Sequence, residues 1–439
     1  MTQPIGYSIR EQRSWYFYDW ANSAFASTVV TLFLGPYLTV LAEAAAGPNG
    51  RITPLGISID PRSYWSYLIS LSVLTQVICL PVLGAVADYS GRKKQLLGFF
   101  AYVGAGATVA MYFLSGTSYL LGGALFLIAN LAFGASMVLY NAFLPEIAPE
   151  DKRDDVSSKG WGIGYLGGGL LLALNLVLYA NAKKLGMEEA LAVRISLCSA
   201  GVWWALFSII PLLGLRNRKP TRHVPSGEHI AIIGFRQLGH TCKDMRHYPH
   251  TLIFLLAYLI YNDAIQAVLT LSGQFGSDYL KIPMGQLTLA ILMVQFVAFF
   301  GALLFNLLAR KMTAKGAVML SLVLWTVLMF VMYAVKTTMA FFIAAAIVAV
   351  IMGGSQALSR SLFSVMIPPG KEAEYFSVYE VSDKGTSWLA PLLFGLTLDL
   401  TGSYQYAILS LIVFFIGGLI VLARVNVTRA MKEAGREAA

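Results

Sequence analysis

The sequence predicts an all-α membrane protein in which twelve transmembrane helices form two pseudo-symmetric six-helix bundles. Three observations support this prediction: a composition suited to lipid, twelve long apolar runs, and an internal repeat that relates the two halves of the chain. Of the 439 residues, 57% are hydrophobic and only 13% are charged, about half the charged fraction of an ordinary soluble protein. We therefore expect a lipid bilayer, rather than water, to surround most of the chain.

The apolar runs are long enough to cross a bilayer, which requires about 20 mainly apolar residues per helix. The first six runs lie near residues 15–42, 64–87, 95–115, 119–144, 159–181 and 193–215. The second six lie near residues 251–274, 286–309, 315–335, 339–366, 374–398 and 404–424. Residues 216–250 break the hydrophobic pattern between the two sets. The predicted organisation is thus a bundle over 1–215, a cytoplasmic linker over 216–250, and a bundle with a tail over 251–439.

Basic residues follow the expected topology and explain the formal net charge of +9 without any nucleic-acid partner. The side that carries the N-terminus is rich in lysine and arginine, including Arg92, Lys93, Lys94, Arg310 and Lys311. The opposite side holds few, including Arg51, Lys183 and Lys336. Basic loops stay in the cytoplasm, so we expect both termini to be cytoplasmic. The chain is polar through Ser14, so we expect no cleavable signal peptide.

The cysteines and histidines indicate neither a disulfide framework nor a metal site. Cys79, Cys198 and Cys242 are scattered. All five histidines lie in or beside the linker, at spacings that match no familiar ligand motif. Apolar residues recur in the linker at near-helical spacing from Ile230 to Met245, with basic residues between them. This pattern predicts an amphipathic helix on the anionic inner leaflet. We expect no metal and no cofactor.

The two halves repeat each other at several positions. VSSKG (156–160) begins the fifth span and VSDKG (381–385) begins the eleventh. GAVADYSGRKK (84–94) has a degraded counterpart in ALLFNLLARKM (302–312), which aligns Asp88 with Asn306. Many transporters build alternating access around a central site from such repeats.

The loop between the second and third spans carries two glycines, an aspartate and two basic residues at fixed spacing. These are Gly84, Asp88, Gly91, Arg92 and Lys93. A juxtamembrane basic turn is the simple interpretation, but the spacing resembles the signature loop of the major facilitator superfamily. The resemblance implies that Asp88 engages neighbouring basic groups and the N-terminal end of the eleventh span, where the helix dipole favours a carboxylate. It thereby implies a gate, not a substrate ligand.

Further motifs resemble one branch of this superfamily, the autophagy-related vacuolar effluxer family. The motifs are YDWANSAF (18–25), YNAFLPEIA (140–148), VSSKGWGIGYLGGGLLLALN (156–175), YNDAIQ (261–266), GGSQALSRSLF (353–363) and EYFSVYEVSDKG (374–385). The fungal members are described as vacuolar amino-acid exporters, and most bacterial members have no assigned substrate. The resemblance implies twelve helices and a bacterial member of the family, but leaves the substrate open.

Polar residues concentrate in the spans that, by the same resemblance, line the central cavity, namely the first, fourth, seventh and tenth. Buried polar groups are costly in a bilayer and usually face the bundle interior. The candidate substrate or coupling residues are Asp19, Asn22, Tyr140, Asn141, Tyr261, Asn262, Asp263, Gln266, Gln356 and Arg360, with Trp161 and Tyr165 on the fifth span.

Several of these residues have alternative interpretations that the sequence leaves open. Asp19 is either a cavity residue or an interfacial charge at a helix start, and Asp263 is either a proton site or half of a structural ion pair. Arg360 either holds an anionic group of the substrate through its planar fork or neutralises Asp263 or Glu380. Trp161 and Tyr165 either reach the cavity or pack.

A second set of charged residues predicts an inner gate rather than direct ligands. The set is Glu146, Lys159, Glu380, Asp383 and Lys384. On the fifth span, Gly160, Gly164 and Gly168 have a spacing that lets helices approach closely. We interpret this stripe mainly as packing, with sliding of the fifth span as the functional alternative.

The predicted function is a secondary active transporter for a small polar solute such as an amino acid, with proton coupling as an open question. A carrier of an apolar or lipid-like substrate and a non-transporting receptor are the alternatives. The motifs H-E-x-x-H and G-x-S-x-G and a phosphate-binding loop are not found, so we do not expect an enzyme. We expect a monomer in the bilayer.

Overall fold

The computed structural model describes residues 7–61, 64–218, 244–384 and 389–436, and it confirms the predicted all-α fold class. Within these residues, eleven helices are long and apolar enough to cross a membrane. Among the described residues, one isolated β-bridge is recorded, between Ile52 and Ile59.

The helices before the linker form one group, called here the N half. Its helices are α1 (Ile9–Ala24), α2 (Leu34–Ala44), α3 (Tyr64–Ser90), α4 (Lys93–Ala110), α5 (Tyr119–Ala142), α6 (Leu144–Ile147), α7 (Arg153–Ala180) and α8 (Glu189–Gly214). A π-helical segment, Phe25–Phe33, joins α1 to α2. Short 3₁₀ turns lie at Pro54–Gly56, Met111–Phe113, Glu150–Lys152 and Lys183–Leu185.

The helices after the linker form the C half. They are α10 (Pro249–Gln274), α11 (Met284–Met312), α12 (Ala314–Ala334), α13 (Thr338–Val365), α14 (Glu372–Lys384), α15 (Leu389–Thr401), α16 (Tyr404–Ser410), α17 (Ile412–Ala423) and α18 (Val427–Glu433). A 3₁₀ turn at Met245–His247 precedes α10, and a π-helical turn at Phe275–Tyr279 follows it.

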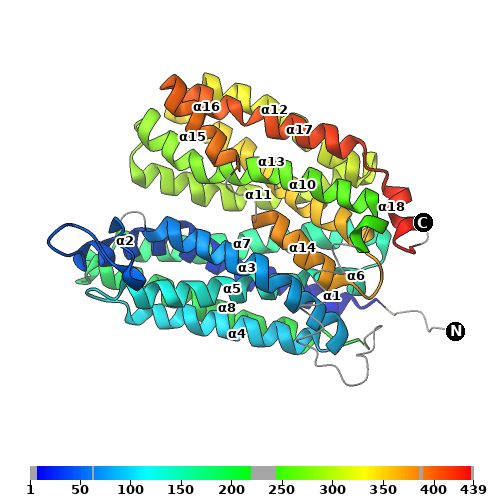
Figure 1. Cartoon of the computed structure of the whole chain (residues 1–439), viewed down its shortest axis with the longest axis horizontal. Coiled ribbons are helices and arrows are strands. Elements are labelled where there is room, and N and C mark those ends of the chain that lie inside the picture. Colours follow the sequence, from blue (N-terminus) through cyan, green and yellow to red (C-terminus); the bar gives the residue numbers. More distant parts are fainter. Residues whose placement is uncertain (1–6, 62–63, 219–243, 385–388, 437–439) are drawn as a thin grey trace.

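The two halves lie side by side and are closest at the end of the molecule that carries both termini, called here the base (Figure 1). Helix α14 packs against α3 and α5 of the N half, and α7 packs against α11 and α13 of the C half. Toward the opposite end the ribbons of the two halves diverge (Figure 1). The inter-half contacts that matter for function therefore lie between the base and the middle of the bundle.

The first observed span begins earlier than predicted. Apolarity predicts residues 15–42, but the helix begins at Ile9, because helical hydrogen bonding continues into a polar stretch outside the apolar window. The eleventh predicted span, over 374–398, covers parts of α14 and α15, and residues 385–388 between them lie outside the described residues. The predicted amphipathic helix falls largely within 219–243, also outside them.

Candidate functional site

The signature loop holds the N-terminus of α14 against α3 at the base. The Asp88 carboxylate accepts hydrogen bonds from the backbone N–H groups of Ala373 (3.2 Å) and Glu374 (2.9 Å). The first N–H groups of a helix have no partner within the helix, so a carboxylate there satisfies them and interacts favourably with the helix dipole. The contact that the family resemblance implied is thus present in the structure.

Glycines in this loop permit the close approach. A Cβ atom on Gly84 would lie 2.5 Å from the carbonyl oxygen of Ala373, so any larger residue would push α14 away. Gly91 ends α3 with φ of 60°, in the left-handed region that glycine adopts most readily. The glycine spacing of the motif therefore has a direct steric basis.

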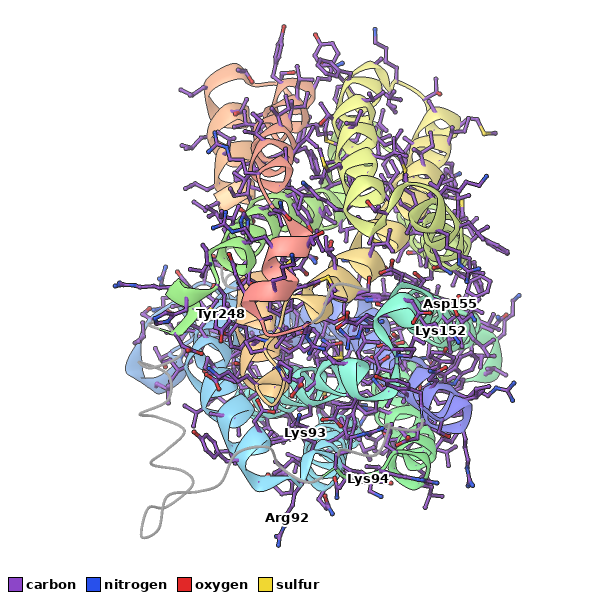
Figure 2. All side chains as sticks on the ribbon, turned by 90° about the vertical axis from the view of Figure 1, so that its right-hand side faces the viewer. Arg92, Lys93, Lys94, Lys152, Asp155 and Tyr248 are labelled. Carbon is purple, nitrogen blue, oxygen red and sulfur yellow. The ribbon has the colours of Figure 1, made fainter. Side chains whose placement is uncertain are left out.

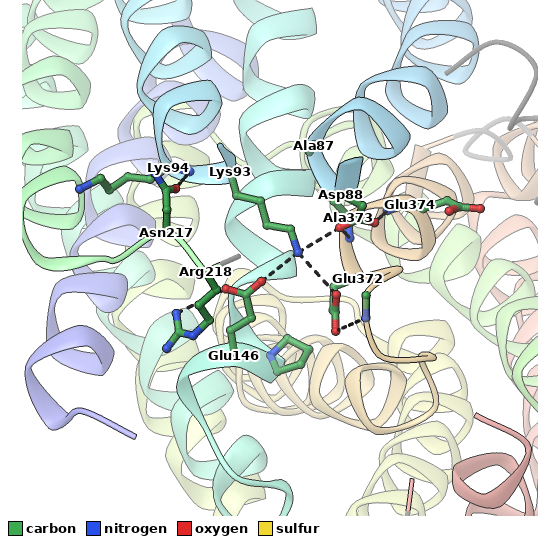
Figure 3. Close-up of polar contacts among 12 residues, drawn as sticks. Ala87, Asp88, Lys93, Lys94, Glu146, Asn217, Arg218, Glu372, Ala373 and Glu374 are labelled. Atoms are coloured by element: carbon green, nitrogen blue, oxygen red, sulfur yellow. Dashed lines mark hydrogen bonds and ion pairs between the residues drawn. The ribbon is translucent and has the colours of Figure 1, made fainter. Parts of the chain in front are cut away.

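Lys93 links three carboxylates from both halves (Figure 3). Its Nζ lies 3.0 Å from Asp88, 2.9 Å from Glu146 and 3.5 Å from Glu372. Burial opposes ionisation of Glu372, but the Lys93 ammonium and the N–H of Gly370 outweigh it, and they hold the pKa of that carboxyl below its usual range. Arg92, in contrast, is exposed at the base (Figure 2), so it does not join this cluster.

The degraded repeat in the C half makes a second inter-half contact. Asn306 donates to Oδ1 of Asp155 at 2.9 Å, and Nη2 of Arg310 donates to the same oxygen at 3.0 Å. Asp155 lies in the first turn of α7, the counterpart of the eleventh span. Lys159 also binds Asp155, at 2.6 Å, and is exposed. The structure thus pairs Lys159 with Asp155 and not with Glu146, because it lies on the same helix one turn away.

Deeper in the interface, Arg360 of α13 pairs with Asp19 of α1. Nη1 of Arg360 lies 3.2 Å from Oδ2 of Asp19, and both side chains are buried. Nη1 also lies 3.4 Å from Oδ1 of Asn141. Nε donates to Oγ of Ser157 at 2.9 Å, and Nη2 donates to its carbonyl oxygen at 2.8 Å. The interfacial alternative for Asp19 is therefore wrong, because the residue lies inside the bundle and carries a partner.

The expected partners of Arg360, Asp263 and Glu380, are not the observed ones. Arg360 projects from α13 toward α1 and α7 of the N half, whereas the recorded hydrogen bond of Asp263 stays within the C half. Glu380 instead accepts a 2.8 Å hydrogen bond from Asn141. The direction of α13 thus brings the arginine to the N half.

Three aromatic rings of the N half surround the Arg360 guanidinium. Its Cζ atom lies 4.9 Å from the ring centroid of Trp15, 5.5 Å from that of Tyr140 and 5.3 Å from that of Trp161. Trp15 stacks on Tyr140 with centroids 4.2 Å apart and donates to its carbonyl oxygen at 2.8 Å. The Tyr140 hydroxyl in turn donates to Asp19 at 2.7 Å. Distances below about 6 Å favour cation–π attraction.

Glycine at position 160 allows the rings and the ion pair to come together. A Cβ there would lie 2.6 Å from a ring carbon of Trp15 and 3.1 Å from both Nη2 of Arg360 and Oδ2 of Asp19. The glycine stripe on α7 continues this fit, because a Cβ on Gly164 would lie 3.0 Å from Cβ of Asp19. The stripe is therefore consistent with its interpretation as a packing face.

Other predicted cavity residues form separate contacts. The Tyr165 hydroxyl donates to Gln356 across the interface at 2.7 Å, and the Tyr261 and Ser359 hydroxyls lie 2.6 Å apart within the C half. Asn22 donates to the sulfur of Met137 at 3.0 Å. Asn262 is buried and Gln266 is partly buried. The side chains of Asp383 and Lys384 lie outside the described residues.

Asp263 is buried at 2% exposure and contacts α15. Its Oδ2 accepts a 2.9 Å hydrogen bond from the backbone N–H of Ala390. Within the part of the chain that the structure describes, its Oδ1 has no hydrogen-bond partner. The ion pair with Arg360 that would have made Asp263 structural is absent from the described contacts.

Sequence reasoning missed the residues whose partners lie far along the chain. Trp15 and Ser157 bind Arg360, Glu372 binds Lys93, and Asp155 binds Asn306. Two of these residues could have been found from the sequence: Asn306 aligns with Asp88 in the internal repeat, and Asp155 lies four residues before Lys159. Within the described residues, no group of three or more histidines, cysteines or carboxylates is arranged to hold a metal ion.

Comparison with known proteins agrees with this geometry. Residues 8–435 match the family model "Vacuole effluxer Atg22 like". The chain is 33% identical to the MFS-type transporter YxiO of Bacillus subtilis (strain 168), over 94% of each protein. It is 26% identical to Autophagy-related protein 22-1 of Penicillium rubens, over 97% of this chain and 91% of that protein. Its fold is similar to that of XylE, a major facilitator superfamily proton:xylose symporter, with a TM-score of 0.72, 12% identity and 98% of each chain covered.

Proposed function

Because this chain belongs to the Vacuole effluxer Atg22 like family and is an MFS-type secondary transporter, we propose that it carries a small zwitterionic solute, an amino acid. Transport proceeds by alternating access, with protons as the coupling ion and with the base of the bundle in the cytoplasm of a bacterial cell. The substrate class, the coupling ion and the orientation are proposals, and each is supported by a feature of the interface.

The observation that carries the proposal is the buried pair of Asp19 and Arg360. One residue comes from each half, and their charged atoms lie 3.2 Å apart in the interface. An α-amino acid presents one ammonium and one carboxylate. An aspartate and an arginine that separate with the two halves expose one binding group of each sign, and the arginine fork matches a carboxylate. Pairing the two charges in the absence of substrate avoids leaving either one buried alone.

The orientation of the base is supported by its charge. Arg92, Lys93, Lys94 and Lys152 lie on the face seen in Figure 2. An excess of lysine and arginine marks the cytoplasmic side of a membrane protein. With this orientation, the contacts of Asp88, Lys93 and Asp155 close the cytoplasmic side.

Alternating access then requires a defined set of contacts to break. Opening the base separates Asp88 from the α14 amides and Arg360 from Asp19. Opening the far end instead keeps these contacts. Asp263, a buried carboxylate with one oxygen that lacks a partner among the described residues, is the proposed proton carrier, because a buried charge without a full set of partners is costly.

A transport assay in proteoliposomes tests the proposal. The purified protein is reconstituted, and uptake of each of a panel of radiolabelled amino acids is measured with and without an imposed pH gradient. We expect at least one amino acid to be taken up, faster with the gradient, and Arg360→Gln to abolish that uptake. Flux of apolar solutes with no flux of any amino acid would overturn the substrate class. Flux that ignores the gradient would overturn the coupling.

A further inference from the structure

The guanidinium of Arg360 occupies a binding site built entirely by the other half of the protein. Its four hydrogen-bond acceptors, on Asp19, Asn141 and Ser157, all belong to the N half. So do the three rings around it, those of Trp15, Tyr140 and Trp161. We call the six residues Trp15, Asp19, Tyr140, Asn141, Ser157 and Trp161 the cage.

The geometry points to the cage being a receptor for a guanidinium-bearing solute, with Arg360 as a tethered ligand that fills it while the base is closed. The inference rests on the proposed function, since it needs the halves to separate at the base. It goes beyond that function because it names the cationic group of the transported solute and the residues that recognise it.

The chemistry of the cage fits a guanidinium in particular. The acceptors receive hydrogen bonds from Nε, Nη1 and Nη2 of the arginine, so they bind the planar guanidinium along more than one edge. One carboxylate supplies the compensating charge, and the aromatic faces supply the attraction that a planar, weakly hydrated cation feels most strongly. A compact ammonium ion could satisfy fewer of these acceptors at once.

Much of the cage is held together without Arg360. The hydrogen bond from Trp15 to the Tyr140 carbonyl, the stacking of their rings and the bond from the Tyr140 hydroxyl to Asp19 all lie within the N half. Asp19 and Tyr140 therefore stay positioned when the C half moves away. A binding site whose groups are already oriented loses little affinity to ordering.

One polar atom of the cage lacks a partner while Arg360 is present. The indole Nε1 of Trp161 is buried and has no hydrogen-bond partner among the described residues. A buried donor without an acceptor is costly. A solute larger than the arginine side chain, with an acceptor beside its guanidinium, would satisfy this donor. The unmet donor therefore favours a ligand that is not identical to Arg360.

Arg360 and the solute therefore compete for the cage. While Arg360 fills the cage, no second cation binds there, because the Asp19 carboxylate and the ring faces are already in use. When the base opens, Arg360 leaves and the solute takes its place. Binding of the solute then opposes closure of the base until the solute is released or has moved on.

Equilibrium binding of a probe tests the inference without relying on transport. The probe is n-butylguanidinium, and N-butylurea is its neutral analogue of similar shape. Binding to the full-length protein in detergent is measured by isothermal titration calorimetry. We expect Arg360→Ala to bind n-butylguanidinium at least tenfold more tightly than the wild type, because the cage is vacated. Adding Asp19→Asn to that variant should remove at least tenfold of the affinity.

Three further variants keep the test decisive. Asp88→Asn retains Arg360 but loosens the base, and it should bind the probe at least threefold more tightly than the wild type. If Arg360→Ala does not fold, this variant decides, with Trp161→Ala added to it as the cage-deficient form. Arg194→Ala is the matched control, since it removes an arginine that lies over the Tyr112 ring, 5.8 Å from its centroid, outside the cage. It should bind as the wild type does.

Three results would overturn the inference. The first is equal binding of N-butylurea and n-butylguanidinium, which would mean that the cage does not distinguish a cation from a neutral group. The second is unchanged affinity in Arg360→Ala. The third is tight binding to Arg360→Ala but none to Asp88→Asn, which would mean that Arg360 never leaves the cage. Transport that fails while probe binding holds would count against the proposed function alone.

Discussion

Lys93 on α4 and Glu372 on α14 form an ion pair of 3.5 Å across the interface between the two halves, although they are 279 residues apart in the chain. Lys93 also contacts Asp88 and Glu146 of its own half. The Lys93 ammonium thus lies among three carboxylates at the point where the halves meet (Figure 3). Arg218 lies 3.4 Å from Glu146 and Arg436 lies 4.0 Å from Glu372. Closure of the base depends on Lys93, because without it two arginines would face three carboxylates.

Replacing Lys93 by glutamine should therefore open the base in a pH-dependent way. In the wild type, Lys93 helps to hold the pKa of Glu372 below its usual range, so the pair is fully ionised above the ordinary glutamate pKa of about 4.3. Its contribution to closure is lost only as pH falls below that value, through the lowered pKa. The contribution of the Lys93–Glu372 pair to wild-type closure should then be constant from pH 5 to 8.

In Lys93→Gln the sign reverses, because Arg218 and Arg436 then face three carboxylates, and protonation of a carboxylate favours the closed base. Closure of this variant should be strongest near pH 5 and weaken as pH rises toward 8. Labelling of a cysteine introduced at Ser158, a buried residue in the second turn of α7, measures the opening. Lys94→Gln, one residue further along, is the control and should behave as the wild type does. A pH-independent Lys93→Gln would contradict the argument.

Asp88→Asn should shift the protein toward the state with an open base and slow transport while leaving folding largely intact. An asparagine oxygen can still accept one hydrogen bond from the α14 amides, but the charge is lost. Hydrogen bonds to charged groups contribute about 1.5–3 kcal/mol, which corresponds to a population shift of at least about tenfold. Base-side cysteine labelling and transport rates report the two effects.

The control for this variant is Arg92→Gln, which changes an exposed residue of the same loop. It should alter labelling little. Equal effects of Asp88→Asn and Arg92→Gln would mean that the motif acts through general charge at the membrane surface and not through the contact with α14.

The base could be predicted from the sequence better than the centre of the interface. The signature loop is a local pattern, and its resemblance to a known motif predicted the contact of Asp88 with the N-terminus of α14 that the structure shows. The pairing of Arg360 with Asp19 joins residues 341 positions apart, and no local pattern specifies which way α13 presents its arginine. In the sequence, Trp15 resembles any apolar residue at the start of a span. Its stacking on Tyr140 does not change the hydrophobic periodicity of the sequence, so the pattern could not indicate it.

The same limit applies to Asp263. Apolar runs located the spans, but they could not predict that Asp263 accepts a hydrogen bond from the backbone N–H of Ala390, 127 residues further along the chain. Lys159 was placed in the gate with Glu146 because both are charged and near the base. Its partner is Asp155, one helical turn away, which i,i+4 spacing could have indicated.

Gly160→Ala should destabilise the protein by disturbing the cage. The added methyl group would lie 2.6 Å from the Trp15 ring and 3.1 Å from both charged partners. Overpacking of a well-packed interior costs about 1–3 kcal/mol, so the thermal unfolding midpoint in detergent should fall and the base should become more accessible.

Gly106→Ala on α4 is the matched control, because a Cβ there meets no atom within 4 Å. Alanine is favoured over glycine inside a helix by roughly 0.5–1 kcal/mol, so this variant should be as stable as the wild type or more so. A Gly160→Ala protein as stable as the Gly106→Ala protein would show that the interface can relax around position 160.

A double-mutant cycle should show that Asp19 and Arg360 depend on each other. Asp19→Asn alone leaves a buried guanidinium without its carboxylate, and Arg360→Gln alone leaves the carboxylate. Removing one partner of a buried pair costs about 3–5 kcal/mol. The double variant should be more stable than either single variant, as measured by thermal unfolding. Additive losses would mean that the two charges do not interact across the interface.

Asp263→Asn should separate the structural role of this residue from its proposed role in coupling. The asparagine oxygen can still accept the hydrogen bond from Ala390, which Oδ2 of Asp263 accepts at 2.9 Å, so this contact with α15 is kept and the protein should fold. What is lost is the ability to exchange a proton at a buried site. We expect transport driven by a pH gradient to be abolished, while exchange of labelled for unlabelled substrate at equal pH on both sides persists. Asp263→Ala removes the hydrogen bond as well, and should lower both activities and the unfolding midpoint. Full gradient-driven transport by Asp263→Asn would refute the proton-site hypothesis. Loss of exchange by this variant, with a normal unfolding midpoint, would instead assign the carboxylate to substrate binding.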